Sequence, residues 1–128
     1  MRRIGVPDLV WLNVAVVRQT GGSSGVRDAG SLEAAAARSY AGCGDKELFP
    51  TPFDKAAALM ESVIQRHPFV DGNKRTGLLA GAALLYVAGY DFAAPKAEMV
   101  ETPVALAERG IGTEQLSRWF EAHAESRE

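Results

Sequence analysis

The chain has few of the residues that build disulfides or zinc sites. Cys43 is its single cysteine, which excludes an intramolecular disulfide and any zinc site made from several cysteines. The two histidines, His67 and His123, leave little for a histidine-rich metal centre. A disulfide-stapled scaffold and a multi-cysteine zinc domain are therefore excluded.

An excess of charge of one sign is also missing. The 14 basic and 16 acidic residues leave a formal net charge of −2. Proteins that bind nucleic acid through its phosphates carry a basic patch or stripe. No direct nucleic-acid binding is expected, and a DNA-binding helical domain is disfavoured.

Long hydrophobic runs are absent as well. The longest uncharged stretch, Thr76–Tyr90, is shorter than the roughly 20 residues that a membrane-spanning helix needs. Arg2 and Arg3 stand near the start, but Asp8 interrupts the short apolar stretch after them, so no signal peptide is expected. These features predict a soluble cytoplasmic protein with no membrane partner.

What remains is the composition of an ordinary globular domain. Hydrophobic residues make up 47% of the 128 residues, which is enough to bury a core without staples. We expect one domain over residues 1–128. Apolar spacing and helix punctuation predict helices at 7–20, 32–37, 52–67, 73–89, 95–109 and 113–120.

Local signals suggest where these helices begin and break. Ser31, Thr51 and Thr113 are predicted N-caps, and Pro103 is expected to kink or divide its helix. A short hairpin near Leu48 is the one candidate for strand structure.

The stretch Gly77–Ala88 carries no charge on any face, as in a helix at the buried centre of a bundle. Trp11 is expected to be a core residue, with a partner groove as the alternative. The fold class is therefore all-α, with about six helices around a central hydrophobic helix.

The turn that precedes this central helix has the residues of an anion site. The run His67–Gly77 leads into a helix N-terminus, where unpaired amides and the helix dipole favour phosphate. Gly72 would let another group approach the backbone, and Lys74 and Arg75 add positive charge. Asp71 fits such a site if Mg²⁺ lies between the carboxylate and the phosphates.

His67, at the other edge of the loop, could take a proton from an attacking hydroxyl. Simpler interpretations exist for each residue alone. His67 could end a helix, Asp71 could belong to a turn, and Asn73 could be an N-cap. Lys74 and Arg75 could form a solvated face. Their convergence on one helix N-terminus favours phosphoryl or nucleotidyl transfer.

The same run resembles the signature of the Fic/Doc family, His-x-Phe-x-Asp/Glu-Gly-Asn-x-Arg. Six positions fall in register: His67, Phe69, Asp71, Gly72, Asn73 and Arg75. The segments Asp28–Glu33 and Gly89–Tyr90 resemble other parts of Doc ("death on curing") toxins, so the resemblance covers roughly residues 2–123.

Two positions indicate the branch of the family. Fic adenylyltransferases have glycine at the position of Lys74 and usually arginine at that of Leu78, whereas Doc toxins have the lysine and lack the arginine. The resemblance thus implies a kinase that binds ATP in the inverted sense and phosphorylates a threonine of elongation factor Tu, which stops translation. Gly72 is Fic-like, which keeps protein adenylylation as an alternative; a catalytically silent Fic-fold binding module is another.

The family pattern also implies roles for individual residues. His67 would be the general base, Asp71 would hold Mg²⁺, and the remaining site residues would bind the phosphates of ATP: Gly72, Asn73, Lys74 and Arg75. The segment Gly42–Phe49 lies where the family has a target-positioning flap.

The resemblance further implies inhibition in trans, by a cognate Phd-like antitoxin whose C-terminal segment folds on the toxin. Ser117–Ala122 is the nearest match to the inhibitory helix of many Fic proteins, but its last position departs from that pattern. An ordinary amphipathic helix with Trp119 and Phe120 toward the core is the expected structure of this segment.

Overall fold

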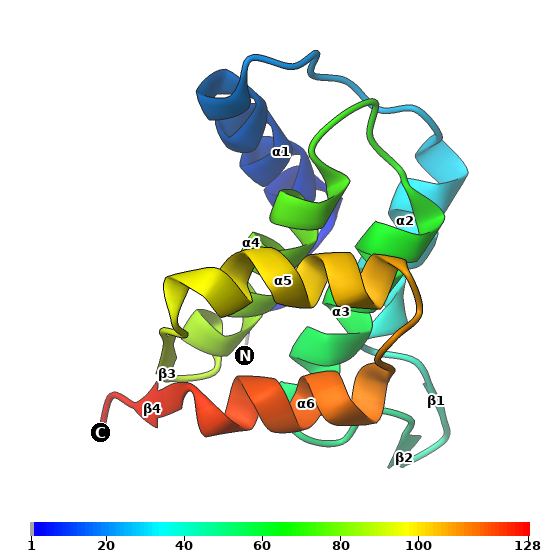
Figure 1. Cartoon of the computed structure of the whole chain (residues 1–128). Helices are drawn as coiled ribbons and strands as arrows, with labels where there is room; N and C mark the ends of the chain where they lie inside the picture. Colours follow the sequence, from blue (N-terminus) through cyan, green and yellow to red (C-terminus); the bar gives the residue numbers. More distant parts are fainter. Residues whose placement is uncertain (1) are drawn as a thin grey trace.

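The computed structural model describes residues 2–128, which form six helices and four short strands (Figure 1). The helices are α1 Val6–Thr20, α2 Ala29–Arg38, α3 Pro52–Arg66, α4 Asn73–Val87, α5 Lys96–Ala107 and α6 Thr113–Ala122. The strands are β1 Gly42–Cys43, β2 Lys46–Glu47, β3 Tyr90–Phe92 and β4 Ala124–Ser126. The all-α prediction is confirmed.

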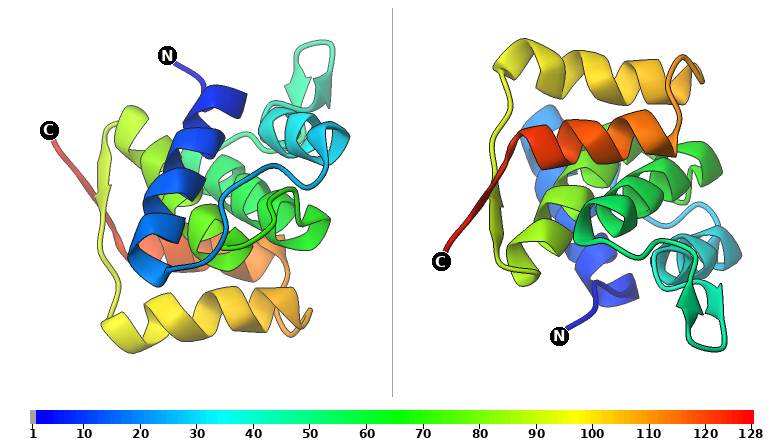
Figure 2. Two further views of the ribbon diagram at one scale, coloured as in Figure 1. Left: turned by 90° about the horizontal axis from the view of Figure 1, so that it is seen from above. Right: turned by 90° about the horizontal axis from the view of Figure 1, so that it is seen from below.

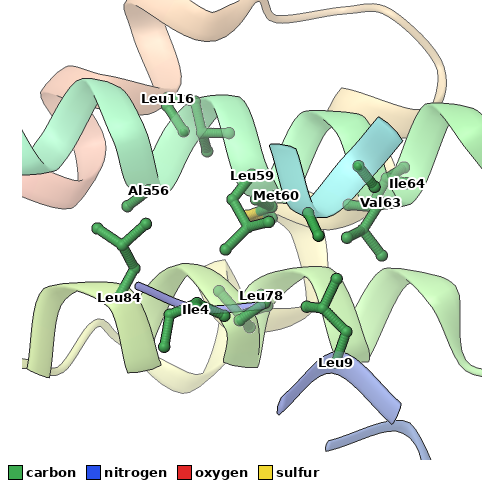
Figure 3. Packing of buried hydrophobic residues seen from close by; sticks show 14 of the residues in the cluster. Ile4, Leu9, Ala56, Leu59, Met60, Val63, Ile64, Leu78, Leu84 and Leu116 are labelled. Carbon is green, nitrogen blue, oxygen red and sulfur yellow. The ribbon is translucent and has the colours of Figure 1, made fainter. Parts of the chain in front are cut away.

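The antiparallel pair α3 and α4 forms the centre of the fold. α1 packs on α4 and α2 on α3, while α5 and α6 cover the other side of the pair (Figure 2). Apolar side chains from the two central helices interdigitate, among them Leu59, Met60 and Val63 from α3 and Leu78 and Leu84 from α4 (Figure 3).

The predicted central helix α4 therefore shares the centre with α3. Leu84 and Leu85 of α4 are fully buried, but Leu79 and Tyr86 of the same helix are exposed. A helix without charged residues can still expose part of its apolar surface to solvent, because apolar atoms make up much of any protein surface.

A close approach between α4 and α6 depends on a glycine. A Cβ atom built on Gly81 would lie 2.6 Å from Cζ of Phe120, which is fully buried. Any side chain at position 81 would therefore displace the aromatic ring that fixes α6. Trp119 is partly buried beside Phe120 and donates from Nε1 to Glu98 (2.9 Å), so the expected inward face of α6 is confirmed.

The helix starts are only partly as the sequence predicts. Thr51 does cap α3, in a reciprocal capping box with Asp54. The cap of α2 is Asp28, whose carboxylate accepts from the amide of Ser31, so the prediction of Ser31 as the cap is wrong. The cap of α6 is Gly112, and Thr113 is already inside the helix. Asp and Ser both favour the N-cap position, so the sequence before α2 offers two candidate caps, Asp28 and Ser31.

Other expectations fail for tertiary reasons. α5 continues through Pro103 as one helix, so the expected division of this helix is wrong; Pro103 and Leu106 are buried where α5 packs on α3 and α4. Trp11 is 70% exposed on α1, so its assignment to the core is wrong.

The hairpin expected near Leu48 is present as β1 and β2. The pairing of β3 with β4 joins segments that are too distant in sequence for local patterning to predict. No helix within residues 2–128 is both long and apolar enough to cross a membrane.

Candidate active site

The loop between α3 and α4 forms one wall of a cavity of about 320 Å³. The loop and the first turn of α4 supply most of the lining, with one residue each from α3 and the end of α5: Ile64, His67, Val70, Asp71, Gly72, Asn73, Lys74, Arg75 and Ala107. The predicted base, metal-binding and phosphate-binding residues therefore all line a single cavity: His67, Asp71, Gly72, Asn73, Lys74 and Arg75.

His67 ends α3 in an unusual backbone conformation. Its φ of 53° and ψ of 55° are left-handed, and its amide donates to the carbonyl of Val63 (3.1 Å). A residue with a Cβ pays about 1–2 kcal/mol for this conformation. Backbone strain of this kind is concentrated at functional sites, where the surroundings over-determine it.

Asn73 connects the loop to the imidazole of His67. Its buried side chain accepts from the amide of Phe69 (3.0 Å) and donates to the carbonyl of the same residue (3.0 Å). Its Nδ2 also lies 3.1 Å from Nδ1 of His67. The side chain of Asn73 is thus engaged inside the protein, which leaves its backbone amide as the group directed outward. Since Gly72 is the N-cap of α4, the alternative assignment of Asn73 as the cap is wrong.

Gly72 serves a tight contact with α1. It has φ 78°, and a Cβ on it would lie 3.1 Å from Cγ1 of Val16 and 3.4 Å from Nδ2 of Asn13. The close approach predicted at Gly72 therefore occurs with α1, and Gly72 also lines the cavity, where its assignment to phosphate binding stays a prediction. The glycine is needed because the chain must turn left-handed directly against a packed helix.

The start of α4 presents unpaired donors next to two cations. The first intrahelical hydrogen bond runs from the amide of Thr76 to the carbonyl of Gly72 (2.9 Å). Within residues 2–128 no acceptor pairs with the amides of Asn73, Lys74 and Arg75. Lys74 and Arg75 are exposed and line the same cavity, and Arg75 reaches only Gln19, at 3.4 Å. Unpaired amides, the positive end of the helix dipole and two cations together favour a bound anion.

Asp71 is the one carboxylate that lines this cavity. Its Oδ2 accepts from the amide of Ser23 (2.8 Å), and its backbone carbonyl accepts from Asn13 (2.8 Å). No hydrogen bond within the described chain uses Oδ1. That oxygen fits Mg²⁺, which binds one or two carboxylates together with substrate phosphates. Residues 2–128 contain no cluster of three His, Cys, Asp or Glu side chains that could hold a metal without such a substrate.

The loop between α1 and α2 pairs with the loop between α3 and α4, which the sequence did not predict. Val26 pairs with Phe69 in an antiparallel bridge. The amide of Val70 donates to the carbonyl of Gly25 (3.0 Å), and the amide of Arg27 donates to the carbonyl of Pro68 (2.7 Å). No local pattern predicts this pairing, because the two loops lie some forty residues apart.

Asn13 is a further residue missed from the sequence. It is 1% exposed and donates to the carbonyl of Asp71 and to Oγ1 of Thr76 (3.2 Å). A signal was available, since Asn13 is the one polar residue in the apolar stretch Leu9–Val17. A buried amide in such a stretch needs partners, and here they belong to the site.

Comparison with known proteins agrees with this geometry. The model of the Fic/DOC family matches residues 4–85, which include every residue of the cavity except Ala107. The chain is also 45% identical over 74 residues to a protein named Toxin Doc from Mycolicibacterium smegmatis. That match covers 58% of this chain and 57% of the relative, so it spans little more than half of either protein. Because the family model matches more than half of the chain, including the loop His67–Arg75, the chain belongs to the Fic/DOC family.

Proposed function

We propose that this protein is a Doc-like toxin that transfers the γ-phosphoryl group of Mg-ATP to a threonine hydroxyl of elongation factor Tu and so arrests translation. The observation that carries the proposal is the single cavity that contains a histidine, one carboxylate, two cations and unpaired helix amides. The relative named Toxin Doc supports the toxin assignment.

The start of α4 would hold the phosphates. The amides of Asn73, Lys74 and Arg75 and the side chains of Lys74 and Arg75 would neutralise the charge on the phosphoryl oxygens. Asp71 would hold Mg²⁺, which supplies further charge neutralisation when bound. Positioning and charge neutralisation account for most of the rate enhancement in phosphoryl transfer.

His67 would act as the general base. The threonine oxygen forms a bond to the γ-phosphorus as the bond between that phosphorus and the β–γ bridging oxygen breaks, and ADP leaves. The hydroxyl proton passes to Nε2 of His67. General-base catalysis of this kind contributes about 10²–10⁴-fold to a rate.

The choice of kinase over adenylyltransferase rests on Lys74 and Leu78. Lys74 adds bulk and charge where the adenylylating branch has glycine, and Leu78, which is 7% exposed, has no donor for a terminal phosphate. An ATP bound for adenylyl transfer would leave its β- and γ-phosphates poorly neutralised. Gly72 supports the alternative, protein adenylylation, because it keeps the Fic-like loop. The intact His67 and Asp71 weigh against a silent binding module.

Labelled ATP separates these reactions. Purified elongation factor Tu or a bacterial extract is incubated with the protein, Mg²⁺ and ATP labelled at either the α- or the γ-phosphate. We expect label from γ-labelled ATP alone, with the mass of a phosphate on the target. An AMP adduct would establish adenylylation instead, and absence of any label would favour the silent module.

A cognate antitoxin is the proposed regulatory partner. Two apolar grooves could receive its amphipathic segment. One, of about 360 Å³, lies between α1 and α4 and includes Trp11, Leu12 and Tyr86. The other, of about 500 Å³, lies between α4 and α5, includes Val100, and shares Lys74 and Arg75 with the cavity of the candidate active site.

Expression in bacteria tests this part of the proposal. The chain should arrest growth alone and be tolerated together with the antitoxin from its own operon. Trp11→Asp and Val100→Asp place a charge in the first and second groove respectively, and the variant that abolishes rescue identifies the groove. Harmless expression of folded protein would contradict the toxin assignment.

A further inference from the structure

We infer that Arg27 is a positioning residue for His67, because its guanidinium fixes the end of α3 that presents the imidazole to the cavity. This inference rests on the proposed role of His67 as the general base. Arg27 belongs to the loop between α1 and α2 and lies outside the family signature.

The contacts of Arg27 are with the backbone of the catalytic segment. Its Nε donates to the carbonyl of His67 (2.6 Å), and its Nη2 donates to the carbonyl of Arg66 (2.9 Å). These carbonyls are at the C-terminal end of α3, where a cation complements the negative end of the helix dipole. No other side chain within residues 2–128 donates to either carbonyl.

His67 needs such a contact because its backbone conformation is intrinsically unfavourable and only its amide is hydrogen-bonded within α3, to the carbonyl of Val63. Its φ of 53° is disfavoured by its own Cβ. Pro68, which follows it, disfavours the right-handed helical region for the preceding residue. An unrestrained residue at this position would adopt an extended backbone, which would turn the imidazole away. Arg27 prevents this by holding the carbonyl of His67, which fixes its ψ.

The remaining contacts of this junction do not involve the carbonyl of His67, whose amide donates to the carbonyl of Val63. The amides of Arg27 and Asp28 both donate to the carbonyl of Pro68 (2.7 and 3.2 Å). Asn73 contacts the imidazole itself. A variant without the guanidinium therefore keeps the pairing of the two loops and loses the restraint on the carbonyl of His67. The two carbonyls that lose this donor belong to Arg66 and His67, which are both exposed residues, so the variant buries no unpaired charge.

The test compares Arg27→Ala and Arg27→Lys with Arg118→Ala in the full chain. Arg118 is an exposed arginine of α6 whose side chain makes no hydrogen bond within residues 2–128, so its variant controls for the loss of one positive charge. The measurements are the imidazole NMR signals of His67 and His123, thermal unfolding, and kcat and KM for ATP. A His123→Gln variant assigns the two histidines.

In Arg27→Ala we expect the His67 signals to shift or broaden while the His123 signals match those of the control. A displacement of about 1 Å in a reacting group costs about 10²-fold, so kcat should fall by about 10- to 100-fold with an unchanged KM for ATP. Arg27→Lys should recover part of kcat, because an ammonium supplies donors without the planar fork.

Unchanged His67 signals in Arg27→Ala would overturn the inference. So would a change of both histidines together with a lower melting temperature, since that would indicate a general loss of structure. If the wild-type chain transfers nothing from ATP, the proposed function fails, but the His67 signals still decide whether Arg27 positions the ring.

Discussion

Asn73 holds the imidazole of His67 through a contact of 3.1 Å between Nδ2 and Nδ1. The orientation of this amide is set by Phe69, whose N–H donates to Oδ1 and whose carbonyl accepts from Nδ2. An N–H group of Asn73 therefore faces Nδ1. Nδ1 is the acceptor, and the proton of the neutral ring lies on Nε2.

This contact predicts the tautomer of His67. Long-range nitrogen NMR of the free chain should show the Nε2–H form. To accept a proton at Nε2, the ring must carry its own proton on Nδ1. We therefore expect the contact between Asn73 and Nδ1 to open when nucleotide and target fill the site. Asn73→Asp replaces the donor with an acceptor and should favour Nδ1–H. A free wild-type chain with the proton on Nδ1 would contradict this interpretation.

His67→Ala should abolish transfer and growth arrest while the fold is kept. Loss of a general base costs about 10²–10⁴-fold in rate. The melting temperature should change by only a few degrees, about the effect of one net hydrogen bond of ~1 kcal/mol. His123→Ala is the matched control, since His123 lies at the end of α6 and contacts Trp119. Equal transfer by the two variants would exclude His67 as the base.

Asp71→Asn should weaken the Mg²⁺-dependent activity without releasing the loop between α1 and α2. An asparagine oxygen can still accept from the amide of Ser23, so the variant removes charge and keeps that contact. Changes around metal sites typically cost about 10- to 100-fold in affinity, and we expect half-maximal activity to need that much more Mg²⁺. A metal titration of transfer activity measures this, with circular dichroism as the check on folding. An unchanged titration curve would remove Asp71 from the metal site.

Asp54 links the start of α3 to α6 in a pH-dependent way. Burial raises the pKa of Asp54, but hydrogen bonds from Ser117 (2.7 Å) and Thr51 outweigh it and bring the pKa below its usual value. A carboxylate with a lowered pKa stabilises the fold above the ordinary Asp pKa of about 3.9, and that stability is lost as the pH falls through the folded value.

We therefore expect Asp54→Asn to lower the free energy of unfolding at pH 7 by about 1–2 kcal/mol, the usual scale for disrupting an N-terminal cap, because Asp54 is the reciprocal partner of the cap residue Thr51. The difference from wild type should disappear in denaturant unfolding at a pH below the folded pKa of Asp54. Ser117→Ala removes one hydrogen bond and keeps the carboxylate, so its effect should be smaller. A deficit of the same size at both pH values would contradict a role for the ionised carboxylate.

The sequence determined the features that depend on neighbouring residues. The capping box of Thr51 and Asp54, the left-handed turn at Gly21 and the uncharged run of α4 are all local, so helix positions and an all-α fold follow from them. The cavity residues were also predictable, because one loop and one helix turn contain most of them.

Only the tertiary structure decided which residues support that loop. Asn13, Ser23 and Arg27 contact it from α1 and the loop after it, and their hydrogen bonds cross forty or more positions of sequence. The exposure of Trp11 was likewise decided by which face of α1 packs on α4. Helix propensity and capping act within a few residues, whereas these contacts depend on how the helices pack, and local patterning does not encode that packing.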